Sequence, residues 1–118
     1  MRNTEILIKK FEEASIKYGE EREKDGVPRI INKQVDLLNK VSKELYESYN
    51  LEKLICLLNH PNDYVKLNAA TYVALVAPSD AIDTMVKLSE KEGEIGFSSK
   101  MFLDLYKKGE IKFEWKDL

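Results

Sequence analysis

The sequence predicts a single all-α domain of about three antiparallel helix pairs, followed by a short extended C-terminal tail. Apolar residues recur at alternating spacings of three and four along most of the chain, which is the period of amphipathic helices. With 118 residues, 43% of them hydrophobic, the chain is long enough to bury one core without cross-links. The small numbers of Gly (5) and Pro (3) exclude a collagen-like or low-complexity chain.

The first helix is expected to begin at a cap formed by Asn3 or Thr4, with Glu5 in the first turn, where the helix dipole favours an acid. It fades near Gly19. The polar run 20–26 is either a solvated last turn or a loop. The apolar positions of this helix are Leu7, Phe11, Ala14 and Tyr18.

The second helix is expected to start at Pro28, because proline suits a first helical turn, and to run to about Ser48. Asn50 is its expected end, since Asn tolerates the left-handed conformation. The periodic positions of this helix are Ile31, Val35, Leu38, Ser42, Leu45 and Tyr49.

A short third helix starts at Leu51 and stops before Pro61, with His60 as a turn residue. Asn62 or Asp63 is expected to cap a fourth helix that runs to about residue 76. This fourth helix is apolar nearly all round, so we expect it to be the buried centre of the fold.

Pro78 starts a fifth helix, which Gly93 is expected to close. Ser98 or Ser99 is expected to cap a sixth helix that ends at Gly109. The inward positions expected in the sixth helix are Met101, Phe102 and Leu105. The tail alternates apolar and polar residues from Ile111 to Trp115, as a strand does, and we expect it to fold back over the last helix pair.

The chain therefore divides into one domain, residues 1–118, with an N-terminal helix pair (1–49), two repeated pairs (50–76 and 78–109) and a tail (110–118). The repeat aligns Ile55 and Leu58 with Met85 and Leu88 at an offset of 30, and Val65, Ala69 and Val73 with Phe97, Met101 and Leu105 at an offset of 32. A repeated helix pair buries its apolar face by stacking on its neighbours, which predicts a short α-solenoid.

Residues 57–70 resemble the signature of a HEAT-type repeat, in which an apolar helix end is followed by a turn and a second helix. The matching residues are Asp63, Val65, Lys66, Ala69 and Ala70, with Lys66 in place of the usual Arg. The resemblance implies a HEAT-like solenoid in which Asp63 caps the second helix, Val65 packs, and the alanines allow close helix approach.

Over residues 11–109 the chain also resembles a small bacterial family of unknown function with HEAT-like helices. The matching positions are Phe11, Ala14, Gly19, Gly96, Phe97, Met101, Lys108 and Gly109; Tyr106 lies where that family often has Trp. Relatives of this architecture occur among immunity proteins of toxin systems. The resemblance therefore implies a protein-binding role, with a cognate toxin as the partner.

The composition argues against an enzyme. One His and one Cys cannot complete an ordinary zinc site, and no phosphate-loop, dinucleotide-binding or nucleophile-elbow motif is present. We therefore expect no catalytic residue, metal or cofactor, and Cys56 is expected to be a buried apolar residue. The longest apolar run has six residues, far short of a membrane span, and no signal-peptide pattern is present, which predicts a cytoplasmic protein.

Two surfaces are candidates for binding a basic partner such as a toxin domain. One is the acidic strip of Glu20, Glu21 and Glu23; the other is the outer side of the second helix at Glu44, Tyr46 and Glu47. Exposed tyrosines could serve as anchors, the candidates being Tyr46, Tyr49, Tyr64 and Tyr106.

Two alternatives remain. The chain could be an adaptor or a homo-oligomeric scaffold, including a homodimer, or it could be an RNA-binding helical repeat. The net charge of −2 and the glutamates interspersed among the N-terminal lysines disfavour nucleic acid as a partner.

Overall fold

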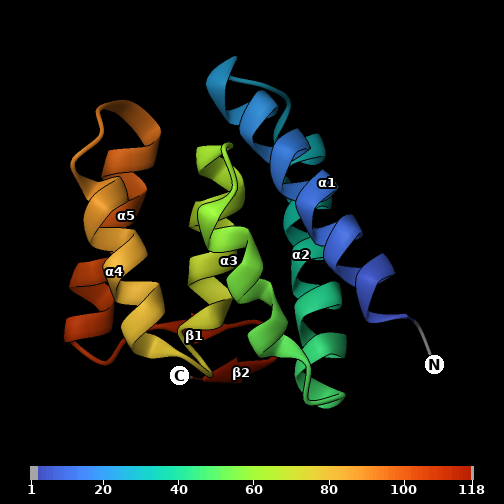
Figure 1. The fold of residues 1–118 in the computed structure, drawn as a ribbon. Helices are drawn as coiled ribbons and strands as arrows, with labels where there is room; N and C mark the ends of the chain where they lie inside the picture. The colour runs from blue at the N-terminus through green and yellow to red at the C-terminus, as the bar shows by residue number, and fades with distance from the viewer. Residues whose placement is uncertain (1–2, 118) are drawn as a thin grey trace.

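The computed structural model describes residues 3–117, in which the chain is helical apart from one short hairpin (Figure 1). The elements in order are α1 (Thr4–Glu23), α2 (Pro28–Glu47), the 3₁₀ helix η1 (Leu51–Asn59), α3 (Asp63–Val73), α4 (Pro78–Ser89), α5 (Gly93–Lys107), β1 (Lys112–Phe113) and β2 (Lys116–Asp117). The prediction of an all-α fold is confirmed.

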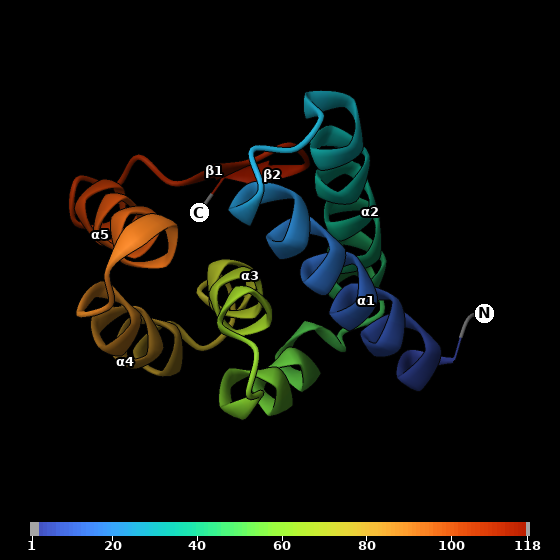
Figure 2. The ribbon, with the colours of Figure 1, turned by 90° about the horizontal axis from the view of Figure 1, so that it is seen from above.

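Helix α3 lies at the centre of the molecule, as predicted. It packs against α1, η1, α4 and α5, and Figure 2 shows it enclosed by the other helices. Seven of its eleven residues are buried, which explains why its sequence is apolar on nearly every side. The helix ends at Val73, three residues earlier than expected, and a tight turn carries the chain to α4.

The first two helices agree with the predicted periods but differ at their ends. Asn3 caps α1, its Oδ1 accepting a 2.7 Å hydrogen bond from the Glu5 N–H, and the helix continues through Glu23. At the end of α2 the left-handed residue is Tyr49 (φ 61°) and not Asn50, so the expected helix stop was wrong by one residue.

The segment η1 corrects the prediction for Cys56. A 3₁₀ helix repeats every three residues, and its buried residues Leu51, Leu54 and Leu57 follow that spacing. Cys56 lies between these positions and is exposed, so it is not the buried residue expected from an α-helical period.

Helix α5 begins at Gly93, five residues before the expected serine cap, so Gly93 does not close the preceding helix. The face of α5 that is turned toward the core also differs from the expected one. Phe97 and Met101 are 61% and 48% exposed, and the prediction that Met101 points inward was wrong. The inward residues are Ile95, Ser99 and Phe102.

These inward residues of α5 follow Val65, Ala69 and Tyr72 of α3 by thirty positions, and the two helices begin thirty positions apart. Between α3 and α5 the corresponding buried positions are therefore offset by 30 residues. The shift to 32 in the second half of each pair was wrong, because the predicted start of the sixth helix was too late.

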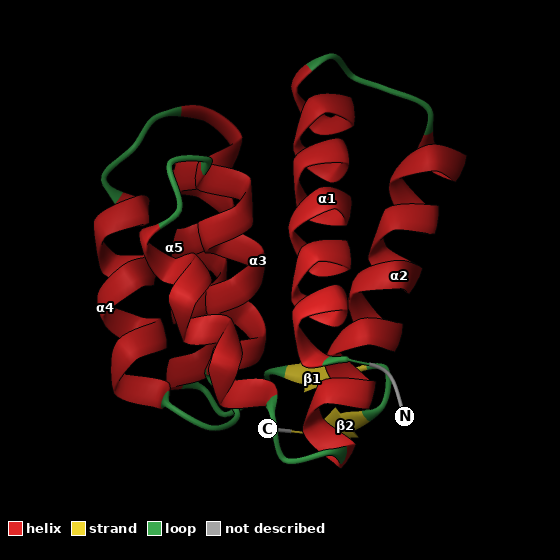
Figure 3. Cartoon of the chain, turned by 45° about the vertical axis from the view of Figure 1, so that its right-hand side comes forward, coloured by secondary structure: helices red, strands yellow, loops and turns green. Residues whose placement is uncertain are grey.

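The tail forms a two-stranded antiparallel hairpin in which Phe113 pairs with Lys116. Its rings pack on other helices than expected: Phe113 stacks on Tyr72 of α3 at 5.1 Å between ring centroids, and Trp115 contacts Tyr46 of α2 at 5.3 Å. Figure 3 shows the strands near the C-terminal end of α2. The expectation that the tail covers the last helix pair was wrong.

Candidate functional site

The acidic strip at the end of α1 consists of three glutamates in different surroundings. Glu20 is exposed to solvent. Glu21 is only 7% exposed, and its carboxylate lies 3.3 Å from Lys24 Nζ. Glu23 accepts a 2.6 Å hydrogen bond from the Tyr64 hydroxyl of α3. Only Glu20 therefore presents an unengaged carboxylate at this strip.

Arg22, between these glutamates, links α1 to α5. Its guanidinium forms an ion pair with Glu94 of α5 and lies 5.9 Å from the centroid of the Tyr18 ring. The hydrogen bond to Glu94 raises the pKa of Arg22, and burial raises the pKa of Tyr18. Burial is also the main cause that raises the pKa of Tyr64. The polar groups at this end of α1 thus connect α1, α3 and α5.

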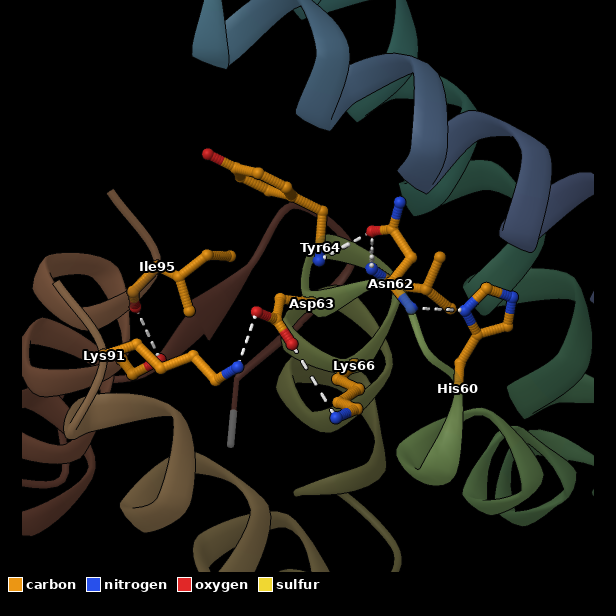
Figure 4. Close-up of polar contacts among 9 residues, drawn as sticks. His60, Asn62, Asp63, Tyr64, Lys66, Lys91 and Ile95 are labelled. Carbon is orange, nitrogen blue, oxygen red and sulfur yellow. Dashed lines mark hydrogen bonds and ion pairs between the residues drawn. The ribbon is translucent and has the colours of Figure 1, made fainter. Parts of the chain in front are cut away.

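Several residues that resemble the HEAT-type signature lie at the turn before α3, where they make polar contacts (Figure 4). Asn62, and not Asp63, is the cap: its Oδ1 accepts hydrogen bonds from the N–H groups of Tyr64 and Val65 at 2.9 and 3.2 Å. Asp63 instead forms ion pairs with Lys66 at 3.7 Å and with Lys91 at 2.9 Å, joining the start of α3 to the α4–α5 turn.

His60 is a turn residue, as predicted. Its Nδ1 accepts a 2.9 Å hydrogen bond from the Asn62 N–H, so the proton lies on Nε2, which donates to Glu12 of α1 at 2.8 Å. The imidazole therefore bridges α1 and the start of α3.

The second predicted surface, on α2, borders a concave site. Glu44 is partly buried, Glu47 is exposed, and the Tyr46 ring is covered by Trp115 and by Lys116, whose Nζ lies 5.4 Å from the ring centroid. Beyond Tyr46 the surface is hollowed into a cavity of about 340 Å³. We call this cavity the α2–η1 hollow; its lining residues are Tyr46, Glu47, Tyr49, Leu51, Glu52 and Val76.

Tyr49 is the most unusual residue of the hollow. Its side chain is 90% exposed and its backbone is left-handed, a conformation that costs a residue with a side chain about 1–2 kcal/mol. The Tyr49 N–H bonds to Tyr46 O at 3.1 Å and the Asn50 N–H bonds to Leu45 O at 2.8 Å, which is the hydrogen-bond pattern that commonly ends a helix at glycine.

The end of α5 shows the same pattern with the usual residue. There Gly109 (φ 71°) donates to Tyr106 O at 3.0 Å, and Glu110 donates to Leu105 O at 2.8 Å. A tyrosine thus occupies in α2 the position that glycine occupies in α5, and it points a large ring into solvent at a strained site. Strained backbone of this kind concentrates at functional sites.

The chemistry of the α2–η1 hollow suits a cationic group. Glu47 and Glu52 are exposed carboxylates, and the Tyr49 ring offers a face for a cation. Leu51 is buried beneath them, and Val76, 40% exposed, adds an apolar wall. A lysine or arginine side chain could bury its stem against the wall and place its charge between the carboxylates.

The sequence pointed to part of this site. Tyr46 and Glu47 were candidate residues and Tyr49 a candidate anchor, whereas Glu52 and Val76 were missed because they come from η1 and from the turn after α3. Tyr64, another candidate anchor, is buried at 6% exposure. Over residues 3–117, no cluster of three or more His, Cys, Asp or Glu side chains could hold a metal ion, and no helix is long and apolar enough to cross a membrane.

The fold is similar to that of the protein RPA1889 from Rhodopseudomonas palustris CGA009. Its crystal structure matches with a TM-score of 0.87, covering 97% of this chain and 96% of that chain. The two sequences are 21% identical, so the likeness concerns the fold alone. No family model and no curated protein matches the chain.

Proposed function

We propose that the chain is a non-enzymatic protein-binding module that binds and blocks a basic protein, as an immunity or antitoxin-type protein blocks its cognate toxin. The observation that carries the proposal is the exposed, strained Tyr49 at the mouth of an acidic hollow. A large aromatic ring with flanking carboxylates is the kind of anchor that binds a basic side chain of a partner.

The proposal includes the architecture expected from the sequence. In it α1 with α2, η1 with α3, and α4 with α5 form three antiparallel pairs of a short HEAT-like solenoid. The supporting observations are that the members of each pair pack against each other and that α3 also packs against α1, α4 and α5. The proposal places the protein in the bacterial cytoplasm and assigns it no cofactor.

The experiment is co-expression of the chain with the product of the gene adjacent to its own. We expect that product to inhibit growth, the wild-type chain to relieve the inhibition, and the two proteins to purify as a complex whose affinity falls as salt is raised. If the adjacent product is not toxic, or forms no complex, the immunity role is wrong.

Variants locate the binding site. Tyr49→Ala, and the double variant Glu47→Gln with Glu52→Gln, should each weaken the complex by about tenfold or more, as loss of an anchor does. Ile6→Ser removes an exposed apolar side chain on α1 and serves as the control, with unchanged affinity expected. A complex that is insensitive to both changes in the hollow would place the partner elsewhere.

A further inference from the structure

Helices α1 and α2 lie side by side (Figure 3), and a cavity of about 340 Å³ opens between them at the surface. We call it the α1–α2 cavity; its walls are side chains from residues 10–17 of α1 and 33–37 of α2. It shares no residue with the α2–η1 hollow. Its volume lies at the lower end of the range in which proteins hold small ligands.

Three lysines of the wall have no acidic partner. Lys10 and Lys17 are seven residues apart on α1 and therefore lie on one face, and Lys33 borders the cavity from α2. All three are exposed, and none forms an ion pair within residues 3–117. Glu13 also lines the cavity. Three lysines against one glutamate leave an excess of two positive charges at the wall.

The charges around the cavity do not change this balance. One turn further along α2 and α1 lie Arg29 and Glu20, whose charges are opposite. Asp36 and Lys40, also of opposite charge, line a different cavity on the other flank of α2. Glu12 of α1 binds the imidazole in the turn before α3. The excess of positive charge is therefore confined to the α1–α2 cavity.

Gln34 is the buried polar residue of the wall. Its side chain is only 3% exposed, yet its amide makes no hydrogen bond to any residue within 3–117. A buried amide without a partner destabilises the folded state. Because Gln34 lines the cavity, a ligand there that accepts a hydrogen bond from its N–H groups removes this cost.

A second cavity lined by lysines shows how this site differs from an ordinary lysine cluster. It has a volume of about 230 Å³ and is lined by Lys66, Lys87 and Lys91. Asp63 already forms ion pairs with Lys66 and Lys91 there. The one buried residue of its wall is a leucine, so no buried polar group faces that cavity.

We propose that the α1–α2 cavity binds the terminal phosphate of a small phosphorylated molecule. A phosphate monoester carries a charge of about −1.5 to −2 at neutral pH and has three strong acceptor oxygens. This charge matches the excess at the wall, and the oxygens can accept from three ammonium groups and from Gln34. A carboxylate or a phosphodiester carries a single negative charge and leaves the wall unbalanced. Leu37, 39% exposed, offers apolar surface to the rest of the ligand.

NMR titration of the isotope-labelled full chain with phenyl phosphate tests the proposal. We expect saturable shifts of amide signals in residues 10–17 and 33–37. Methyl phenyl phosphate, the corresponding diester, should bind at least about fivefold more weakly, because it has lost one charge and one acceptor oxygen. A short oligouridine without a terminal phosphate tests nucleic acid as the source of the phosphate and should also bind more weakly.

Variants separate a built site from a diffuse positive field. Lys10→Ala and Lys33→Ala should each raise the dissociation constant for phenyl phosphate about tenfold, as loss of a hydrogen bond to a charged group does. Lys9→Ala removes the neighbouring exposed lysine, which does not line the cavity, and is the matched control with unchanged affinity. Glu13→Gln removes the one repulsive charge of the wall and should tighten binding.

Gln34→Met tests the buried amide. Methionine has a similar length and no polar group to satisfy, so the melting temperature without ligand should not fall, whereas the dissociation constant for phenyl phosphate should rise at least about fivefold. A folded Gln34→Met chain that binds phenyl phosphate as the wild type does overturns the proposal.

The proposal is also overturned if the shifts do not saturate, or if Lys9→Ala weakens binding as much as Lys10→Ala does. Binding of the diester or the oligouridine as tight as that of phenyl phosphate overturns it as well. Tyr49→Ala should bind phenyl phosphate as the wild type does, because Tyr49 does not line this cavity. The outcome for the α1–α2 cavity and the outcome for the α2–η1 hollow are therefore independent.

Discussion

The ring of Tyr64 lies directly against the backbone of Gly19: a Cβ atom at Gly19 would sit 2.5 Å from Tyr64 Cδ2 and 2.9 Å from its Cβ. Non-bonded carbon atoms do not approach each other so closely, so the contact between α1 and α3 requires glycine here. The hydroxyl of the same ring donates to Glu23, one turn further along α1.

The first prediction follows from this contact. Gly19→Ala should lower the free energy of unfolding by about 1–2 kcal/mol, although alanine is the better helix former, because the added methyl pushes α3 away from α1. Urea denaturation measures the loss. In a chain that already carries Tyr64→Ala, the Gly19→Ala change should cost less free energy of unfolding than it does in the wild type, because the ring is no longer there to be displaced. Equal costs in the two backgrounds would contradict the contact.

The second prediction concerns the strain at Tyr49. Tyr49→Gly should raise the free energy of unfolding by about 1 kcal/mol, because glycine adopts the left-handed conformation without cost. Tyr49→Ala keeps a Cβ at this position and should bring no such gain. Both variants lose the ring and should bind the proposed partner weakly. Equal stability of the glycine and alanine variants would show that strain is absent.

The third prediction separates the glutamates of the acidic strip. Glu20→Lys should change the free energy of unfolding by less than about 0.5 kcal/mol, as exposed substitutions do. Glu21→Lys should cost about 2 kcal/mol, because it buries a cation beside Lys24. Thermal melts of the two variants make the comparison. If both variants have the melting temperature of the wild type, the Glu21 side chain is not buried.

The fourth prediction concerns alkaline pH. Burial raises the pKa of Tyr72, whose hydroxyl donates to Asn39 Oδ1 at 2.5 Å. The unfolded chain releases this proton near pH 10, whereas the folded chain keeps it. The contribution of this group to the free energy of unfolding is therefore fully present below about pH 10 and is lost as the pH rises above it. Tyr72→Phe should reduce that fall by up to about 1.4 kcal/mol per pH unit, measured by urea denaturation across this range. An identical pH dependence in both proteins would contradict the burial of this hydroxyl.

The sequence predicted the helices well where their periods depend on a buried face. Apolar residues at helical spacing indicate a buried face, and the structure places Leu7, Phe11 and Ala14 in the core. The same holds for α3, whose sequence is apolar on nearly every side. The sequence limited each of two caps to a pair of neighbouring residues, Asn3 or Thr4 and Asn62 or Asp63, because a short polar side chain before an apolar period has a specific hydrogen-bonding role. The structure shows that Asn3 and Asn62 are the caps.

The predictions were wrong where a local sequence preference conflicted with burial in the core. Ser98 and Ser99 are good caps in isolation, but starting α5 at Gly93 brings Ile95 into the core, and this burial outweighs a serine cap. Tyr49 at a glycine position breaks a local preference and could not be predicted from it. Glu52 and Val76 join the hollow through tertiary packing, for which a single sequence carries no signal.

The hairpin also affects the order in which the fold can form during synthesis. Neighbouring helices meet through contacts close in the sequence and can pack as soon as they leave the ribosome. The side chains of Asn39 and Glu114, in contrast, are hydrogen-bonded at 3.0 Å although 75 positions separate them. The flank of α2 that carries Asn39 and Tyr46 must therefore stay open to solvent until the hairpin emerges, and in a nascent chain this is the surface on which a chaperone would find exposed aromatic side chains.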